Sequence, residues 1–485
     1  MAQKFPPRHN LGRPWISLAL PSLLLVISIV ALQLRPSNHL CNILSVSLAL
    51  AVSVNIAIGY QLWGSQFDLV WILFNLGILF WYALPGLMRL LNGVDWVESG
   101  ALLTLGPEDF ARSFAVTALF LFLFQLGYLV RLPKNISLLI DNYVLPRAPF
   151  RFARSPILLG TVLILTVAFY VGLSGGVGAA LSNLLSGRSI VKPWTADGNY
   201  GTSLTPFHNL TTTIRVLLAI LSGYLFIHER TSTFRRVFFA SLWVVASATV
   251  AMDSGTRSQL LLCVVPPIIL FIRSYRRRGR TAGLTLAPAI VPIIALLLFT
   301  SSFMRSARSS GDLDEALSDA TLVIQDTDGL AHTAFALREM TLEPPTHESV
   351  LLNILAGPIP RVLLQDKPDL ESVVIHSYYI WGIDIRERGG NTLPYITGQY
   401  LIAWGWLGLV EVGLTLGIIC WVVDQTLMRR SDVYAKLFAA TFATYIFVAF
   451  RLISFGYSFQ LTLLLFLIHL ERLASRKWPA RGPQV

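Results

Sequence analysis

Asp253 and Arg257 stand in the short polar stretch "MDSGTRSQ", which separates two long apolar runs. An arginine guanidinium donates paired hydrogen bonds through a planar fork and keeps its charge, so it suits phosphate oxygens. A carboxylate can act as the base that takes a proton from an attacking hydroxyl group. Because burial of either group is expensive, the pair indicates a site for such chemistry. The structural alternative is that Asp253 only pairs with Arg257 and holds the turn.

Further charged residues can join this chemistry. The basic ones are Arg188 and Lys192, Arg305 and Arg308 in "FMRSARSSGD", Arg361 and Lys367 in "GPIPRVLLQDKPD", and Arg451 in "VAFRLISFGY". Asp312 and Glu339 are alternatives to Asp253 as the base. The alternative for each arginine is that it reaches lipid headgroups or pairs with a local acid.

Other catalytic patterns find no support. The segment "HES" at His347 lacks the second histidine of the HExxH zinc motif, and no P-loop, GxGxxG or GxSxG motif stands in the expected context. The cysteines lie inside apolar runs, so they indicate neither a disulfide framework nor a zinc site. His332 and His376 are isolated in the sequence and are expected to be solvated. The sequence therefore predicts chemistry without a metal, a nucleotide or another cofactor.

Composition indicates a membrane protein. Of the 485 residues, 54% are hydrophobic and 13% are charged. This apolar fraction exceeds the roughly 45–50% of soluble domains. The net charge of +11 comes from short basic clusters between apolar runs. Nucleic-acid binding is not expected, because no single basic face forms.

Apolar windows of spanning length predict twelve transmembrane helices. They lie at 15–33, 40–61, 67–91, 112–130, 156–174, 209–227, 236–252, 258–272, 283–304, 397–422, 433–450 and 454–470. The basic clusters fall at ends that this count places on one side, and positive residues favour the cytoplasm. We therefore expect an all-α polytopic protein of the bacterial cytoplasmic membrane, with residues 1–485 as one domain and both termini in the cytoplasm.

Two large loops are then external, at 175–207 and 305–396. The topology also places Asp253, Arg257 and the further basic residues on the outer side, against the usual trend. In the second loop, the acids and apolar residues of 311–340 favour a helix lying on the membrane surface, and 347–363 favours a short apolar helix. Part of this loop is predicted to pack over the outward cavity as a lid.

Four segments carry a resemblance to a family. They are "SGTRS", "MRSAR", "IPR…KPD", and "GGNTLPYITGQYLIAWGWLGL", which leads into a late span. In these segments, over roughly residues 160–460, the chain resembles the Wzy-type oligosaccharide repeat-unit polymerases, which make O-antigen, capsule or exopolysaccharide. Gln399 departs from the family, because many relatives carry a glutamate at that position. This departure removes one candidate base.

The resemblance implies a membrane glycosyltransferase that needs neither a metal nor a nucleotide sugar. A growing chain would leave its polyprenyl diphosphate carrier for the free end of a newly flipped repeat unit. Asp253, Arg257 and Arg305 are then the catalytic candidates. The substrate-binding candidates are Arg188, Arg308, Arg361, Lys367, Gln399 and Arg451. Implied partners are polyprenyl diphosphate-linked oligosaccharides, the lipid bilayer, a flippase and a chain-length regulator.

Two other functions remain open. A transporter or flippase of lipid-linked sugars would favour charges inside spans, and Arg215 and Glu411 fall there. An O-antigen-ligase-like enzyme shares the many spans and the large outer loop, but it uses lipid A core as acceptor. The asymmetric outer loop and the outer arginines favour an enzyme with a one-sided site over a transporter.

Overall fold

A computed structural model gives the architecture of the chain. The structure describes residues 13–34, 36–63, 69–92, 102, 104–130, 140–150, 154–185, 192–194, 204–228, 232–254, 257–276, 328–348, 371–382, 393–427, 430, 432–451 and 455–477. Helices account for most of these residues, and no strand occurs among them. The predicted all-α class is confirmed.

The helices follow one another along the chain in three groups. The first contains α1 (Arg13–Gln33), α2 (Asn38–Trp63), α3 (Leu69–Ile78), η1 (Leu79–Ala83), α4 (Leu84–Asn92) and α5 (Pro107–Leu129). The second contains η3 (Ile140–Val144), α7 (Pro156–Ser174), α8 (Val177–Leu185), α9 (Thr205–His228), α10 (Thr233–Ser254) and α11 (Arg257–Arg276). The third contains α15 (Gly329–Leu342), α17 (Glu371–Trp381), α19 (Tyr395–Val422), η6 (Val423–Leu427), α20 (Val433–Ala449) and α21 (Phe455–Lys477).

Local signals set helix ends where the sequence predicts them. In α7, the Ser155 hydroxyl accepts a hydrogen bond from the Leu158 amide at 3.3 Å, and Pro156 occupies the first helical position. Gly175 ends the same helix in the left-handed conformation, with φ of 86°. The predicted span at 156–174 therefore coincides with α7.

Each predicted span except 283–304 coincides with a helix, and that segment lies outside the described residues. Within the described part of the chain, seven helical segments are long and apolar enough to cross a membrane. Several of them also expose large apolar side chains, such as Ile157, Ile164 and Leu165 on α7. Such exposure suits contact with lipid. The total of twelve crossings stays a prediction.

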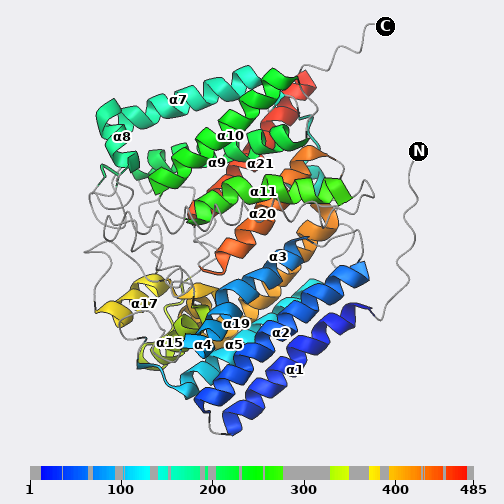
Figure 1. Ribbon diagram of the computed structural model, residues 1–485, viewed down its shortest axis with the longest axis vertical. Helices are drawn as coiled ribbons and strands as arrows, with labels where there is room; N and C mark the ends of the chain where they lie inside the picture. The colour runs from blue at the N-terminus through cyan, green and yellow to red at the C-terminus, as the bar shows by residue number, and fades with distance from the viewer. Residues whose placement is uncertain are drawn as a thin grey trace.

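The helices pack in two groups (Figure 1). The lower group in this view contains α1, α2, α4, α5, α15 and α19, and the upper group contains α7, α9, α10 and α11. Contacts of α20 with both α3 and α11 connect the groups. In Figure 1, α8, α15 and α17 lie at the left of the molecule, whereas the start of α1 and the end of α21 lie toward the right.

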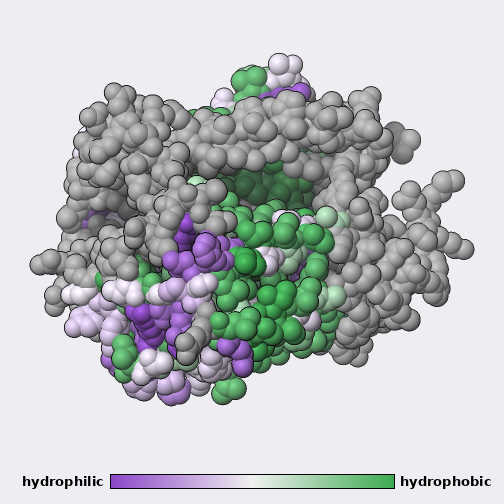
Figure 2. Space-filling model, turned by 60° about the horizontal axis from the view of Figure 1, so that its bottom comes forward, coloured by the Kyte–Doolittle hydropathy of each residue, from purple (hydrophilic) through white to green (hydrophobic). Residues whose placement is uncertain are grey.

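The surface of the lower group divides into two zones. Figure 2 shows apolar residues over the middle of this face and polar residues gathered at its left, the side on which Figure 1 places α15 and α17. Near that end α19 is interrupted at Gly405, whose φ of 61° and ψ of −145° favour glycine. The neighbouring Trp404 and Trp406 are partly exposed, as is common for tryptophan at a membrane interface. The arrangement suits a membrane boundary near this kink.

Candidate functional site

Two histidines and a glutamate form a hydrogen-bonded chain between α15 and α17, which we call the histidine relay. Oε2 of Glu339 lies 2.9 Å from Nδ1 of His376, and Nε2 of His376 lies 3.0 Å from Nδ1 of His332. All three residues are buried, with exposures of 1%, 0% and 3% for Glu339, His376 and His332. The arrangement is therefore a buried path between a carboxylate and two imidazoles.

The order of donors and acceptors in the histidine relay follows from the carboxylate. An ionised glutamate only accepts hydrogen bonds, so Nδ1 of a neutral His376 carries the proton that faces it. Nε2 of His376 then accepts, and Nδ1 of His332 donates to it. The proton-accepting lone pair of His332 consequently lies on its Nε2. This polarity makes His332 the basic end of the relay.

The surroundings of His332 favour its neutral form. Burial lowers the pKa of His332 well below its ordinary value of 6.5, and electrostatic interactions with His376 and Arg451 act in the same direction. The ring of Tyr395 stacks on the imidazole at 5.3 Å between centroids. The lowered pKa keeps the imidazole unprotonated at pH 7, which is the form that a general base requires.

Several contacts fix α15 among its neighbours. The Asp328 side chain accepts from the Ala331 amide at 3.0 Å and caps the helix, and it also pairs with the buried Arg89. Ser113 donates to the Leu330 carbonyl at 2.7 Å. Thr333 and Thr397 are hydrogen bonded at 2.6 Å, which ties α15 to α19. The backbone that carries His332 is thus held from three sides.

Two expectations for this region are wrong. His332 and His376 were expected to be solvated, but they are buried and bonded to each other. The segment 311–340 was expected to lie on the membrane surface, but its part in α15 packs against α5 and α19. Apolar positions on several faces of α15 find partners, which explains the burial of this part; the amphipathic positions 313–324 are not in it. Residues 311–327 lie outside the described part.

The kink in α19 also organises this end of the molecule. A break at Gly405 releases the carbonyls of the preceding turn from their intrahelical partners. Those of Ile402 and Ala403 accept hydrogen bonds from the amides of Thr346 and His347, at 3.2 and 2.8 Å. The segment that follows α15 is thereby fastened to α19 beside the histidine relay.

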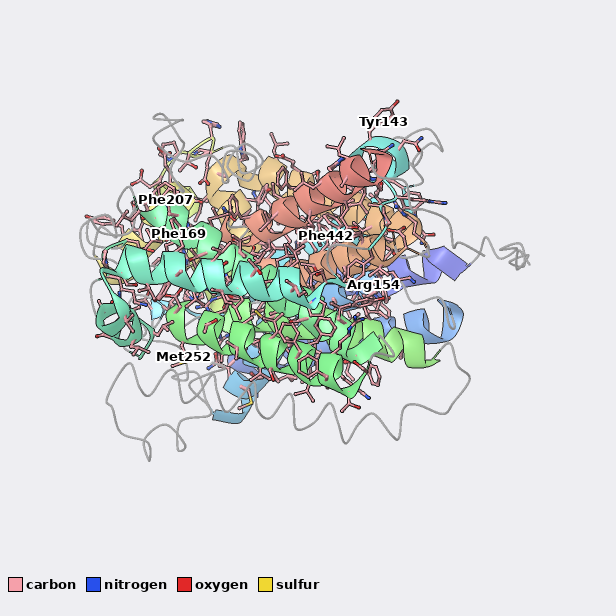
Figure 3. All side chains as sticks on the ribbon, turned by 90° about the horizontal axis from the view of Figure 1, so that it is seen from above. Tyr143, Arg154, Phe169, Phe207, Met252 and Phe442 are labelled. Carbon is pink, nitrogen blue, oxygen red and sulfur yellow. The ribbon has the colours of Figure 1, made fainter. Side chains whose placement is uncertain are left out.

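A second buried polar cluster surrounds Asp253, at the end of α10. We call it the Asp253 cluster; it consists of Asp253, Tyr170, Lys192, His208 and Arg215. Oδ2 of Asp253 lies 2.5 Å from Nη2 of Arg215 and 2.9 Å from Nε2 of His208. Oδ1 accepts from the Tyr170 hydroxyl at 3.1 Å and lies 3.6 Å from the Lys192 ammonium group. Figure 3 shows the preceding residue, Met252, at the surface of α10, while Asp253 is only 3% exposed.

The cationic members of the Asp253 cluster, Arg215 and Lys192, also have hydrogen-bond partners. Arg215 donates to Thr212 and to the carbonyls of Thr211 and Thr249, at 3.2 to 3.3 Å. The Lys192 ammonium group donates to the Asp253 carbonyl at 2.9 Å. These contacts connect the first predicted loop to α7, α9 and α10. A carboxylate with partners on both oxygens is a poor base, so the geometry favours a structural role for Asp253.

The described residues include only some of the predicted site. Asp253 pairs with Arg215 in the structure; Arg257 begins α11, and its side chain lies outside the described part. Gln399 is fully buried on α19, and Arg451 follows α20 near His332. The remaining candidates, which are Arg188, Arg305, Arg308, Asp312, Arg361 and Lys367, lie outside the described residues.

The histidine relay was missed as a unit, although Glu339 was a candidate base. His332 and Glu339 are seven residues apart, which places them on one face of a helix. That spacing was an available signal, but it could not show that His376 lies between them. In the described residues, no group of three or more His, Cys, Asp and Glu side chains is arranged to hold a metal ion.

Comparison with known proteins adds no relative to this picture. No protein-family model, no curated protein and no solved structure matches the chain. The function must therefore be argued from the chemistry of the chain itself.

Proposed function

We propose that this protein is a membrane-embedded glycosyltransferase that polymerises saccharide units linked to polyprenyl diphosphate at the outer face of the cytoplasmic membrane. The histidine relay is the observation that carries the proposal. It supplies a neutral buried imidazole, oriented through a second imidazole by a carboxylate. The sequence segments that resemble oligosaccharide repeat-unit polymerases support the same reaction class.

In the proposed reaction, the acceptor hydroxyl attacks the anomeric carbon of the donor saccharide. The new bond joins that carbon to the acceptor oxygen, and the bond from the carbon to the diphosphate oxygen breaks. Nε2 of His332 takes the hydroxyl proton, and Glu339 stabilises the resulting positive charge through His376. The leaving diphosphate keeps the bonding electrons, so an arginine such as Arg257 would stabilise it.

The decisive experiment combines a deletion strain with complementation. Loss of a polymerase leaves single saccharide units attached downstream, whereas loss of a flippase leaves lipid-linked units inside the cell. We expect single units after deletion and long chains after complementation with the wild-type gene. Complementation with His332→Ala should restore no long chains at normal protein abundance. Accumulation of lipid-linked units inside would contradict the proposal.

A flippase coupled to proton movement is the second candidate. Buried Asp, Glu and His chains inside helical membrane proteins often carry protons, and the Asp253–Arg215 pair lies within two helices of spanning length. Such a protein would change the sidedness of its lipid without changing the length of the glycan. The deletion experiment separates the two functions directly. A ligase would instead leave chain length on the lipid carrier normal and would abolish attachment of the long chains downstream.

A further inference from the structure

Four buried polar atoms in or near the histidine relay find no hydrogen-bond partner among the described residues. They are Oε1 and Nε2 of Gln399, Oε1 of Glu339 and Nε of Arg451. Gln399 has an exposure of 0% and Glu339 of 1%. Buried polar groups nearly always have partners, because leaving one unsatisfied costs about 1–3 kcal/mol. A fully buried amide whose oxygen and nitrogen both lack a partner therefore indicates the place of a ligand.

These atoms belong to elements that meet at His332. Gln399 lies one helical turn after Tyr395, whose ring stacks on His332. Its neighbour Gly398 lies so close to α15 that an added Cβ would be 3.0 Å from that of Ala336. Arg451 follows Phe450, whose carbonyl accepts from the Ile396 amide at 2.9 Å in the first turn of α19. The unpartnered groups thus come from α15, from the beginning of α19 and from the residue that follows α20, and these segments meet near His332.

The chemistry of the four atoms selects the kind of ligand. Nε2 of Gln399 and Nε of Arg451 are donors, while Oε1 of Gln399 and Oε1 of Glu339 are acceptors. An anion would be repelled by Glu339, and a cation would be repelled by Arg451. A neutral molecule with several hydroxyl groups matches the set, because each hydroxyl both donates and accepts.

We propose that Gln399, Glu339 and Arg451 form a subsite for the sugar part of the substrate, namely a neutral, hydroxyl-rich saccharide unit. This inference rests on the proposed function and specifies which part of the lipid-linked substrate these residues recognise. Bound at this position, a saccharide hydroxyl lies beside the relay that takes its proton. Gln399 then acts through binding, as an amide that distinguishes a saccharide from the diphosphate lipid alone.

A structural role for Gln399 gives a different forecast. If Gln399 stabilised the fold through ordered water, replacing it by leucine would lower thermal stability. If it serves a saccharide, Gln399→Leu should leave thermal stability unchanged or raise it, because the variant removes two unsatisfied polar atoms at similar volume. The direction of the shift in melting temperature therefore separates the two roles.

The test measures binding to the purified full-length protein in lipid nanodiscs. One probe is the polyprenyl diphosphate-linked saccharide extracted from the deletion strain, and the other is undecaprenyl diphosphate without a sugar. We expect Gln399→Leu to weaken binding of the saccharide-bearing lipid about tenfold, as for the loss of one or two hydrogen bonds. Its affinity for the sugar-free lipid should be unchanged.

The matched control is Gln125→Leu. Gln125 is equally buried, on α5, where its Oε1 accepts from Trp71 at 2.9 Å. This variant should lose stability and keep both affinities. Wild-type affinity for the saccharide-bearing lipid in Gln399→Leu, or an equal loss for both lipids, would overturn the subsite alone. Failure of the wild-type protein to bind the saccharide-bearing lipid more tightly than the sugar-free lipid would overturn the subsite and count against the proposed function as well.

Discussion

The Asp253 cluster and the histidine relay are both buried polar groups, but they differ in how fully their hydrogen bonds are satisfied. Both carboxylate oxygens of Asp253 have partners, and the guanidinium group of Arg215 is bonded through all three nitrogens. In the relay, Oε1 of Glu339 finds no partner in the described part of the chain, and neither do Oε1 and Nε2 of the Gln399 amide.

This difference separates structural from chemical roles. A well-paired ion pair holds helices together and offers little to a substrate, because both carboxylate oxygens and all three guanidinium nitrogens already have partners. An unsaturated cluster carries a cost in stability, which proteins accept where a ligand supplies the missing bonds. Under the proposed function, the buried polar residues therefore divide into a structural group around Asp253 and a catalytic group around His332.

Loss of the imidazole at position 332 should have the largest effect. Removing a general base typically lowers a rate by about 10²–10⁴-fold, so His332→Ala should abolish long glycan chains while membrane protein abundance stays normal. Glycan chain length on gels, alongside immunoblots, is the measurement. His469→Ala, at a partly exposed histidine of α21 whose ring contacts the Val144 carbonyl of η3, is the control and should leave chain length unchanged. Full-length polymer from His332→Ala would remove the relay from the chemistry.

Breaking the Asp253 cluster should act on stability. Asp253→Ala leaves Arg215 and Lys192 buried beside one another without their counter-ion, at a cost of about 3–5 kcal/mol. We expect low abundance in the membrane and early unfolding in detergent. Asp253→Asn keeps the shape of the side chain, so its loss of stability should be smaller. If Asp253→Ala accumulated normally and made no polymer, the division between the two clusters would fail.

Arg257 tests whether a diphosphate is bound at the start of α11. The planar fork is lost in lysine, although the charge remains, so Arg257→Lys should fail nearly as badly as Arg257→Ala. The expected loss is about 2–4 kcal/mol of transition-state stabilisation, or roughly a hundredfold in rate. Glycan chain length and protein abundance should be measured for both variants. Rescue by lysine would instead indicate an anchor for the turn.

The kink in α19 should depend on glycine. At φ of 61° a side chain strains the backbone, although the nearest atom, the Met340 sulfur, is 3.8 Å from an added Cβ. Gly405→Ala should therefore cost about 1–3 kcal/mol through conformation alone. The thermal midpoint in detergent measures it, with Gly172→Ala as control, because that glycine has open space and lies within α7. Equal midpoints would show that the kink is not strained.

Acid should weaken the fold slightly through His332. Its folded pKa lies below the ordinary value of 6.5, so as the pH falls through 6.5 the unfolded chain binds a proton that the folded chain does not. Stability is then lost by up to about 1.4 kcal/mol per pH unit below 6.5. Melting curves from pH 7.5 to 5.5 should show a steeper loss for the wild type than for His332→Gln. Identical slopes would argue against a neutral buried imidazole.

Several features were predictable from local sequence. Apolar run length located α7 at its observed bounds, because Ser155, Pro156 and Gly175 supply its cap, first position and end. The same property located the other helices of spanning length, since the period and length of an apolar run depend only on nearby residues. By contrast, η1 and the break at Gly405 could not be predicted from hydropathy, because both lie inside continuous apolar runs.

The sequence by itself determined the helical class, the apolar segments and the presence of charges that are costly to bury. Only the tertiary structure decided which charges meet. Arg215 reaches Asp253 across 38 positions and His376 reaches Glu339 across 37, because the packing of α9 on α10 and of α17 beside α15 brings them together. Local patterns cannot encode such pairings, since a hydrogen bond between helices depends on their relative rotation and depth, which the packing of the whole bundle sets.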